Sequence, residues 1–154
     1  MRPPVADIGE HDALIVRTDY SDGHEPGWRA LRAALGADVQ LVDDPAWADA
    51  APAEAVAAAR ATADGGPNVL FLADRTALTG PGHPLLAVTT LRPEDCAEPE
   101  WYAQEIEHGA EFRALAAAVE EINANLSIGN LGFEEFAAAA RRDPEGCYRP
   151  AAGG

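Results

Sequence analysis

The stretch ALIVRTDYSDG, residues 13–23, begins as an apolar run and then breaks into two aspartates within four residues. A short apolar run bounded by turn-forming residues is typical of a buried β-strand. We therefore predict a strand over 13–18 that leaves its sheet at Asp19 and Asp22. Two carboxylates at the end of a buried strand raise the question of what they do there.

The segments that follow this strand alternate between helical and strand-like patterns. Trp28, Leu31 and Leu35 recur at i, i+3 and i+7, which predicts a helix of about ten residues over 25–36. Further strands are predicted over 38–45, 68–74 and 85–91. The alanine-rich stretch 46–66 predicts a helix that Pro52 opens and Gly65 closes. This alternation predicts an α/β fold, a single domain with a small, mostly parallel central sheet and helices packed on its faces.

The predicted domain covers residues 13–142. Residues 1–12 contain two prolines and three acids and are predicted to be a mobile leader, and residues 143–154 to be a tail. Residues 92–111 are rich in acids and lack a helical period, so we expect an acidic loop insertion with at most one helical turn. The next segment predicts a short strand and a helix, and FEEFAAAARR, residues 133–142, a last helix with acids at its start and arginines at its end.

The charge of the chain limits its partners. The formal net charge is -15, and all eleven basic residues are arginine. Nucleic acids and anionic membranes would repel such a chain, whereas a basic protein, a metal ion or a cationic small molecule would be attracted. Acidity without lysine also fits a soluble protein from a GC-rich, actinobacterial genome.

Cysteine usage and the N-terminus indicate the compartment. Cys96 and Cys147 are too few and too far apart for a zinc site or a disulfide framework. The first residues, MRPPVADIGEHD, lack the apolar segment of a signal peptide, and no later run is long enough to span a membrane. We therefore expect a cytoplasmic protein without contact to a membrane.

Several predicted strands end in aspartates, which suggests a site. Asp19 and Asp22 follow the first strand; Asp43 and Asp44 follow the second, and Asp74 the third. In a parallel sheet the carboxyl ends of the strands lie at one edge, where ligands bind. Converging carboxylates would repel one another, raise some pKa values and favour a metal or a protonated amine. The alternative is that these aspartates only form turns and cap helices.

Other side chains could complete this site. His24 follows the first strand and could act as a base, so Asp19, Asp74 and His24 are the catalytic candidates. The candidates for ligand binding are Asp22, Asp43, Asp44, Asn125, Asn130 and Trp101. The sequence names no metal and implies no cofactor. Haloacid-dehalogenase phosphatases and response-regulator receivers are excluded, because Ser21 replaces the second aspartate of the former and the chain has no lysine for the latter.

Two stretches together point to a family. DALIVRTDYSD, residues 12–22, and NANLSIGNLGFEEFAAA, residues 123–139, resemble an actinobacterial family known as domain of unknown function 6924. The resemblance also includes VDDP at 42–45 and FLAD at 71–74, and it implies a fold but no activity. Gly132 departs from the family pattern, which has an aspartate there, and 92–111 is longer than in the family.

Two functions of different classes follow. The first is a small enzyme, or an enzyme-like ligand-handling protein, of actinobacterial specialised metabolism that binds a cationic small molecule or metal at the aspartates. The second is a non-catalytic accessory or immunity-type protein that uses its acidic residues 92–111 to bind a basic protein. In the second case the aspartates at the strand ends would be structural.

Overall fold

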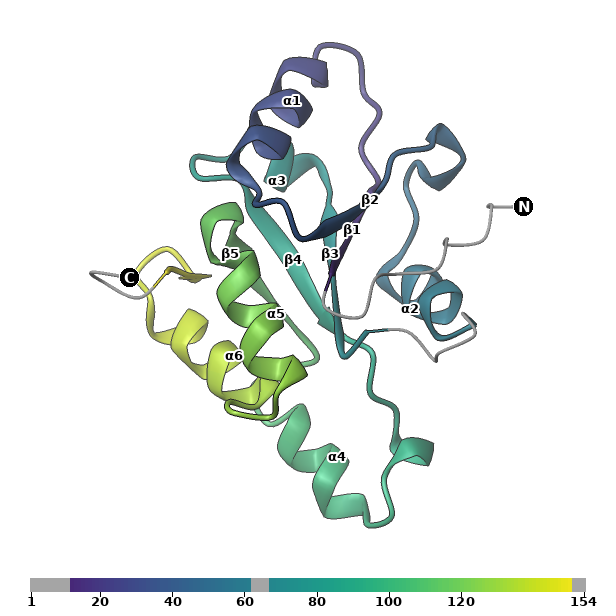
Figure 1. Ribbon diagram of the computed structural model, residues 1–154, viewed down its shortest axis with the longest axis vertical. Helices are drawn as coiled ribbons and strands as arrows, with labels where there is room; N and C mark the ends of the chain where they lie inside the picture. The colour runs from purple at the N-terminus through teal and green to yellow at the C-terminus, as the bar shows by residue number, and fades with distance from the viewer. Residues whose placement is uncertain (1–11, 62–66, 151–154) are drawn as a thin grey trace.

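The computed structural model describes residues 12–61 and 67–150, which form a six-stranded sheet with helices on both faces (Figure 1). The strand order is β2-β1-β3-β4-β5-β6. The strands are β1 (Ala13–Arg17), β2 (Val39–Val42), β3 (Val69–Ala73), β4 (Pro84–Thr89), β5 (Glu111–Leu115) and β6 (Cys147–Tyr148). The α-helices are α1 (Glu25–Ala34), α2 (Pro52–Arg60), α3 (Arg75–Thr79), α4 (Pro99–Glu105), α5 (Val119–Ser127) and α6 (Phe133–Arg142). Three 3-10 turns are η1 (Pro45–Trp47), η2 (Pro93–Asp95) and η3 (Ala116–Ala118).

The predicted α/β class is confirmed, but the expectation of a mostly parallel sheet is wrong because the sheet is mixed. β1 pairs in parallel with β2 and β3, and β5 pairs in parallel with β6. β4 runs antiparallel to both of its neighbours. Only the ten residues between Ala73 and Pro84 connect β3 to β4, fewer than the dozen or so of a parallel crossover. The chain therefore turns back at the edge where β3 ends.

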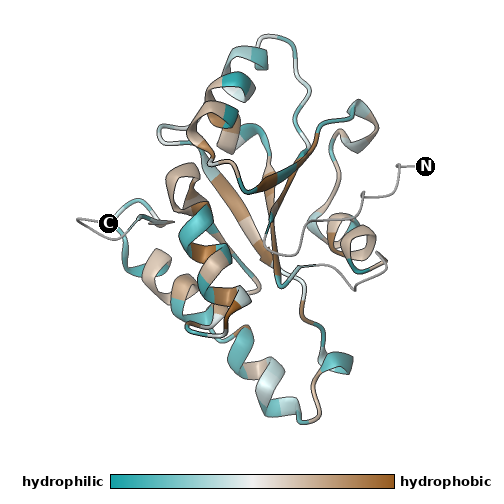
Figure 2. Cartoon of the chain, viewed as in Figure 1, coloured by the Kyte–Doolittle hydropathy of each residue, from teal (hydrophilic) through white to brown (hydrophobic). Residues whose placement is uncertain are grey.

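Alternating side chains of the strands form two hydrophobic cores. Ile15 and Phe71 point to the face covered by α1, α3, α5 and α6, and Leu14 and Val16 point to the face covered by α2. Figure 2 shows this concentration of hydrophobic residues in the central strands. Trp47 of η1 joins the second core and is 1% exposed. Because the sheet is covered on both sides, its central strands are continuous apolar runs.

Two segments contain more regular structure than predicted. Residues 92–111, predicted as a loop, contain η2 and the seven-residue helix α4, each of which has a proline near its start. α4 has no buried residue and lies at the end of the molecule farthest from α1 (Figure 1). The predicted tail contributes β6, which the pairing partner β5 stabilises. The predicted leader lies outside the described residues apart from Asp12, as do residues 151–154 of the tail.

A short helix that the sequence did not predict, α3, fixes the position of α1. A Cβ atom on Gly27 would lie 2.3 Å from the Leu78 carbonyl oxygen, so α1 approaches α3 as closely as it does only because residue 27 is glycine. This contact holds the start of α1, and the turn that precedes it, at the edge of the sheet where β1 ends. No helix in the described part of the chain is long and apolar enough to cross a membrane.

Candidate functional site

The turn between β1 and α1 holds a buried carboxylate with three hydrogen-bond contacts. Asp19 Oδ1 accepts hydrogen bonds from the Ser21 backbone N–H at 3.0 Å and from the Ser21 hydroxyl at 2.6 Å. Asp19 Oδ2 lies 2.5 Å from His24 Nδ1. Burial by itself would raise the pKa of Asp19, but the hydrogen bonds from Ser21 and His24 outweigh it, and the pKa is lowered. Asp19 is therefore ionised at neutral pH.

This carboxylate orients the imidazole of His24. An ionised carboxylate only accepts hydrogen bonds, so His24 Nδ1 carries a hydrogen and donates it to Asp19. The neutral imidazole then has its lone pair on Nε2. The His24 side chain is 20% exposed while that of Asp19 is 8% exposed, so the imidazole lies between the buried carboxylate and solvent. A histidine held in this way can accept a proton at Nε2.

The order of the three side chains differs from that of a serine hydrolase. There the histidine lies between serine and aspartate and takes the serine proton. Here the aspartate lies between them, and the Ser21 hydroxyl donates its hydrogen bond directly to Asp19. His24 therefore does not activate Ser21.

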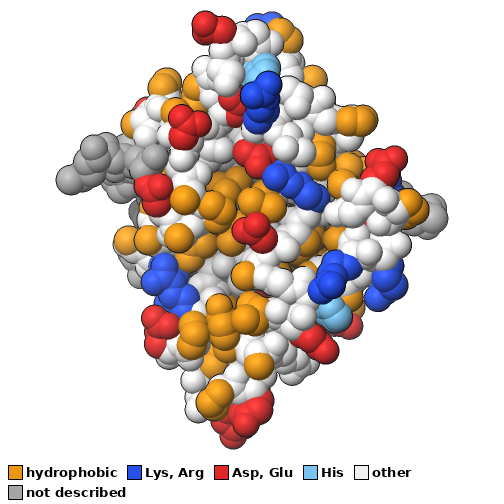
Figure 3. All heavy atoms as spheres, turned by 180° about the vertical axis from the view of Figure 1, so that it is seen from behind, with side chains coloured by type: hydrophobic (Ala, Val, Ile, Leu, Met, Phe, Trp, Pro, Cys, Tyr) orange, Lys and Arg blue, Asp and Glu red, His pale blue; other side chains and the backbone are white. Residues whose placement is uncertain are grey.

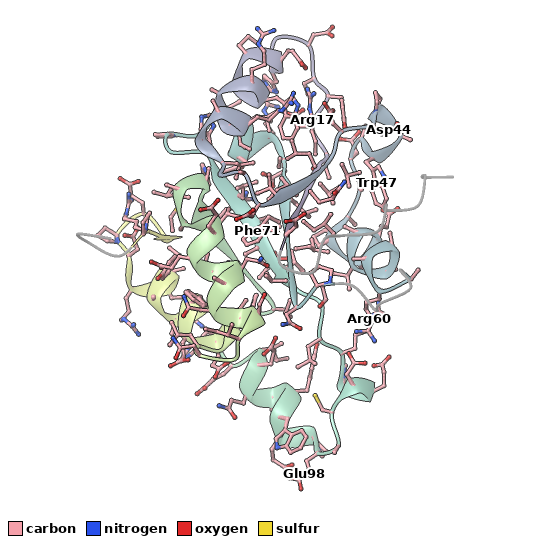
Figure 4. All side chains as sticks on the ribbon, viewed as in Figure 1. Arg17, Asp44, Trp47, Arg60, Phe71 and Glu98 are labelled. Carbon is pink, nitrogen blue, oxygen red and sulfur yellow. The ribbon has the colours of Figure 1, made fainter. Side chains whose placement is uncertain are left out.

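A second cluster surrounds Arg17, the last residue of β1 (Figure 4). Arg17 is 4% exposed, and its guanidinium contacts Asp43 Oδ1 at 3.3 Å and Glu25 Oε2 at 2.9 Å. Asp43 also accepts hydrogen bonds from the Tyr20 hydroxyl and the Trp28 indole, both at 3.1 Å. The guanidinium carbon lies 4.2 Å from the centre of the Tyr20 ring. The charge of Asp43 is thus balanced by an arginine, and the cluster joins β1, β2 and α1.

Two of the three remaining strand-end aspartates cap helices. Asp74 begins α3, where it accepts a hydrogen bond from the Ala77 N–H, and both of its oxygens lie 2.8 Å from the guanidinium of Arg113 on β5. Asp44 caps η1 by accepting from the Ala46 N–H at 2.9 Å. Asp22 is exposed in the turn before His24. Asp19, Asp43, Asp44 and Asp74 therefore each have partners of their own. Among the described residues no three of these carboxylates are placed to share a metal ion.

The other candidate residues lie elsewhere in the fold. Asn130 donates a hydrogen bond to the Asn125 side-chain oxygen at 2.9 Å, which joins the end of α5 to the turn before α6. Asn125 itself donates to the Glu121 carbonyl. Trp101 is 55% exposed on α4, at the opposite end of the molecule from the β1–α1 turn (Figure 1). The structure does not bring these three residues to the aspartates.

Sequence reasoning overlooked the two arginines, Arg17 and Arg113, that balance these carboxylates. A charge inside the apolar run ALIVR was a usable signal, because a buried arginine needs an acidic partner. Arg113 gave no such signal, since its partner Asp74 follows β3 and the strand β4 lies between β3 and β5. Within residues 12–61 and 67–150 no group of three or more histidine, cysteine, aspartate or glutamate side chains is placed to hold a metal ion.

Comparisons with known proteins identify a family. No curated protein matches the sequence. The family model described as Domain of unknown function (DUF6924) matches residues 12–151, which include the β1–α1 turn, the Arg17 cluster and the α5–α6 turn. The match spans nearly the whole chain. The chain therefore belongs to the DUF6924 family.

Proposed function

We propose that this protein binds a small cationic molecule at the β1–α1 turn and that His24 Nε2 accepts a proton there. The observation that carries the proposal is the 2.5 Å contact between buried Asp19 and partly exposed His24. Asp19 is the positioning residue, because its ionised carboxylate keeps the hydrogen on His24 Nδ1 and leaves Nε2 able to accept a proton. Asp22, exposed two residues before His24, adds negative charge that would attract a cation, whereas Glu25 already pairs with Arg17.

We also propose that the protein acts in the cytoplasm of an actinobacterium, in specialised metabolism, without a cofactor. Its acidic, lysine-free composition supports this origin. Both cysteines are free, as is usual in a reducing compartment. Biosynthetic genes beside this one would support the assignment, and a toxin gene there would favour an immunity role.

The first experiment combines NMR with a ligand screen. Long-range ¹⁵N spectra of the wild type should show His24 with its hydrogen on Nδ1, and Asp19→Asn should lose this preference. Divalent metals, polyamines and amino-acid-like amines are then tested by thermal shift on the wild type, on His24→Gln and on the control His83→Gln, which changes a histidine in the turn before β4. Stabilisation that disappears only in His24→Gln supports the proposal. An equal response in all three proteins, or hydrogen on Nε2 of His24 in the wild type, contradicts it.

Asp19→Asn should also destabilise the fold by about 2 kcal/mol at neutral pH, because hydrogen bonds to a charged acceptor are lost. The folded-state pKa of Asp19 is lowered, so its stabilisation is fully present above about pH 4 and is lost as the pH falls through the folded-state pKa. Urea unfolding of both proteins should therefore show a difference at neutral pH that shrinks in acid. A difference that is constant with pH would contradict an ionised Asp19.

The second candidate function, binding of a basic protein, is favoured by Trp101. Trp28 and Trp47 are buried, so Trp101 on acidic α4 is the one tryptophan of the chain that a partner can reach. Exposed tryptophans are frequent centres of protein interfaces, and arginine stacks well on the indole ring. An arginine-rich peptide should quench the fluorescence of Trp101 at low salt, and Trp101→Phe should abolish the change. Quenching that persists in Trp101→Phe would remove the support for this function.

A further inference from the structure

A pocket of about 410 Å³ lies at the edge of the sheet opposite the β1–α1 turn. Asn68, just before β3, and Thr90, just after the antiparallel β4, lie at this edge. The other lining residues come from the end of α2, from η2 and α4, and from the α5–α6 turn. The β1–α1 turn and the Arg17 cluster contribute no residue to this pocket, and its volume is in the range of small-molecule sites.

One carboxylate of the pocket, Glu105 at the end of α4, has no basic partner within residues 12–61 and 67–150. It is half-buried, and its Oε2 accepts a hydrogen bond from the Thr89 hydroxyl. Glu134, at the start of α6, is close enough for its negative charge to act on Glu105. None of the ion pairs between described residues involves either glutamate. Burial, together with the charge of Glu134, therefore raises the pKa of Glu105 even though Thr89 donates to it.

The basic residue of the pocket is already paired. Arg60, labelled in Figure 4, makes two hydrogen bonds to the Asp95 carboxylate at 2.6 and 2.7 Å and a third to the Thr90 carbonyl at 2.8 Å. The hydrogen bonds from Arg60, together with one from the Arg92 N–H, lower the pKa of Asp95 to about 2. Arg60 is therefore held as part of the wall, and its charge is not available to Glu105.

The rest of the wall is largely apolar. Leu91, Leu126, Leu131 and Phe133 line the pocket. On the face of the molecule seen from behind, Figure 3 shows hydrophobic side chains exposed between separate acidic and basic ones. Gly132 lies beside them, and a Cβ atom there would lie 2.5 Å from a Glu134 carboxylate oxygen. Glycine at this position thus leaves room for the Glu134 carboxylate beside the pocket.

We propose that this pocket binds a small organic cation, an amine with an apolar body, whose ammonium group pairs with Glu105. The cation supplies the charge partner that Glu105 lacks, and its apolar part contacts the leucines and Phe133. This site is separate from the β1–α1 turn and does not depend on His24. An amine response that requires Glu105 but not His24 belongs to this pocket, and one that requires only His24 belongs to the turn.

The test uses phenethylamine as the probe and 2-phenylethanol, its neutral analogue, as the ligand control. Saturating phenethylamine should raise the Tm of the wild type by about 5 °C, and the alcohol should not. Glu105→Gln keeps the shape of the side chain and its acceptor for Thr89, and should weaken phenethylamine binding at least about tenfold by calorimetry. Glu107→Gln removes an equal charge from an exposed position near α4 and should bind as the wild type does.

Three results would overturn the proposal. These are equal stabilisation by the alcohol, equal phenethylamine affinity of Glu105→Gln and the wild type, and no response of the folded wild type to phenethylamine. We do not expect Glu105→Gln to lose phenethylamine binding through misfolding. Without ligand, Glu105→Gln should have a Tm at least equal to that of the wild type, because a half-buried carboxylate with a raised pKa is unfavourable when ionised.

Discussion

Replacing Arg17 with methionine should lower the free energy of unfolding by about 3 kcal/mol, at the low end of the cost of breaking a buried ion pair. Arg17 is buried, and its guanidinium contacts both Asp43 and Glu25. Methionine fills similar space but leaves Asp43 with only the neutral donors Tyr20 and Trp28. The partners of Arg17 are partly exposed, so water compensates for some of the loss. Urea unfolding at neutral pH measures the change.

Two further variants test whether loss of the Arg17 ion pairs causes the lower stability of Arg17→Met. Arg29→Met removes an arginine from the exposed side of α1 and should change stability by no more than about 0.5 kcal/mol. Arg17→Lys keeps the positive charge but lacks the planar guanidinium, which can contact two carboxylates at once. It should therefore recover only part of the free energy of unfolding that Arg17→Met loses. If Arg17→Met were as stable as the wild type, the Arg17 cluster would not be what joins β1, β2 and α1.

Phe71→Ala should have the largest effect on stability, a loss of about 3–5 kcal/mol. Phe71, labelled in Figure 4, is fully buried at the centre of β3, where it pairs with Ile15 of β1 and Ala87 of β4. Its ring lies in the larger core, beneath the helices. Domains of this size are stable by only about 5–15 kcal/mol, so the variant should unfold at a much lower urea concentration than the wild type.

The matched control for this prediction is Phe71→Leu, which conserves most of the volume and should cost no more than about 1.5 kcal/mol. A loss below about 1 kcal/mol for Phe71→Ala would mean that the core closes around the missing ring, or that β3 is not central. Circular dichroism of both variants shows whether the helices remain at low urea.

The local sequence pattern predicted most of the helices and strands. β1 and β3 follow from runs of branched apolar residues, and α6 from its apolar face and its terminal charges. α3 was missed because five residues are too few to show a helical period, and its start depends on the Asp74 cap. α4 was missed because it buries no face, so its sequence has no apolar stripe. β6 has two residues and exists because β5 offers it a partner.

The candidate site also has some contacts that the sequence could predict and others that it could not. Asp19, Ser21 and His24 are within five residues of one another, so the sequence could place them in one turn. The partners of Asp43 and Asp74 are 26 and 39 residues away, and no local pattern indicates which arginine approaches which carboxylate.

The α/β class, the positions of the main strands and helices, and the aspartates at the strand ends could all be predicted from the sequence. These follow from local rules, because apolar periodicity and turn chemistry act over a few residues. The antiparallel direction of β4, the pairing of Arg17 and Arg113 with the aspartates, and the pocket around Glu105 became known from the folded structure. Those features depend on which strands and helices become neighbours, and the packing of the whole chain sets those contacts.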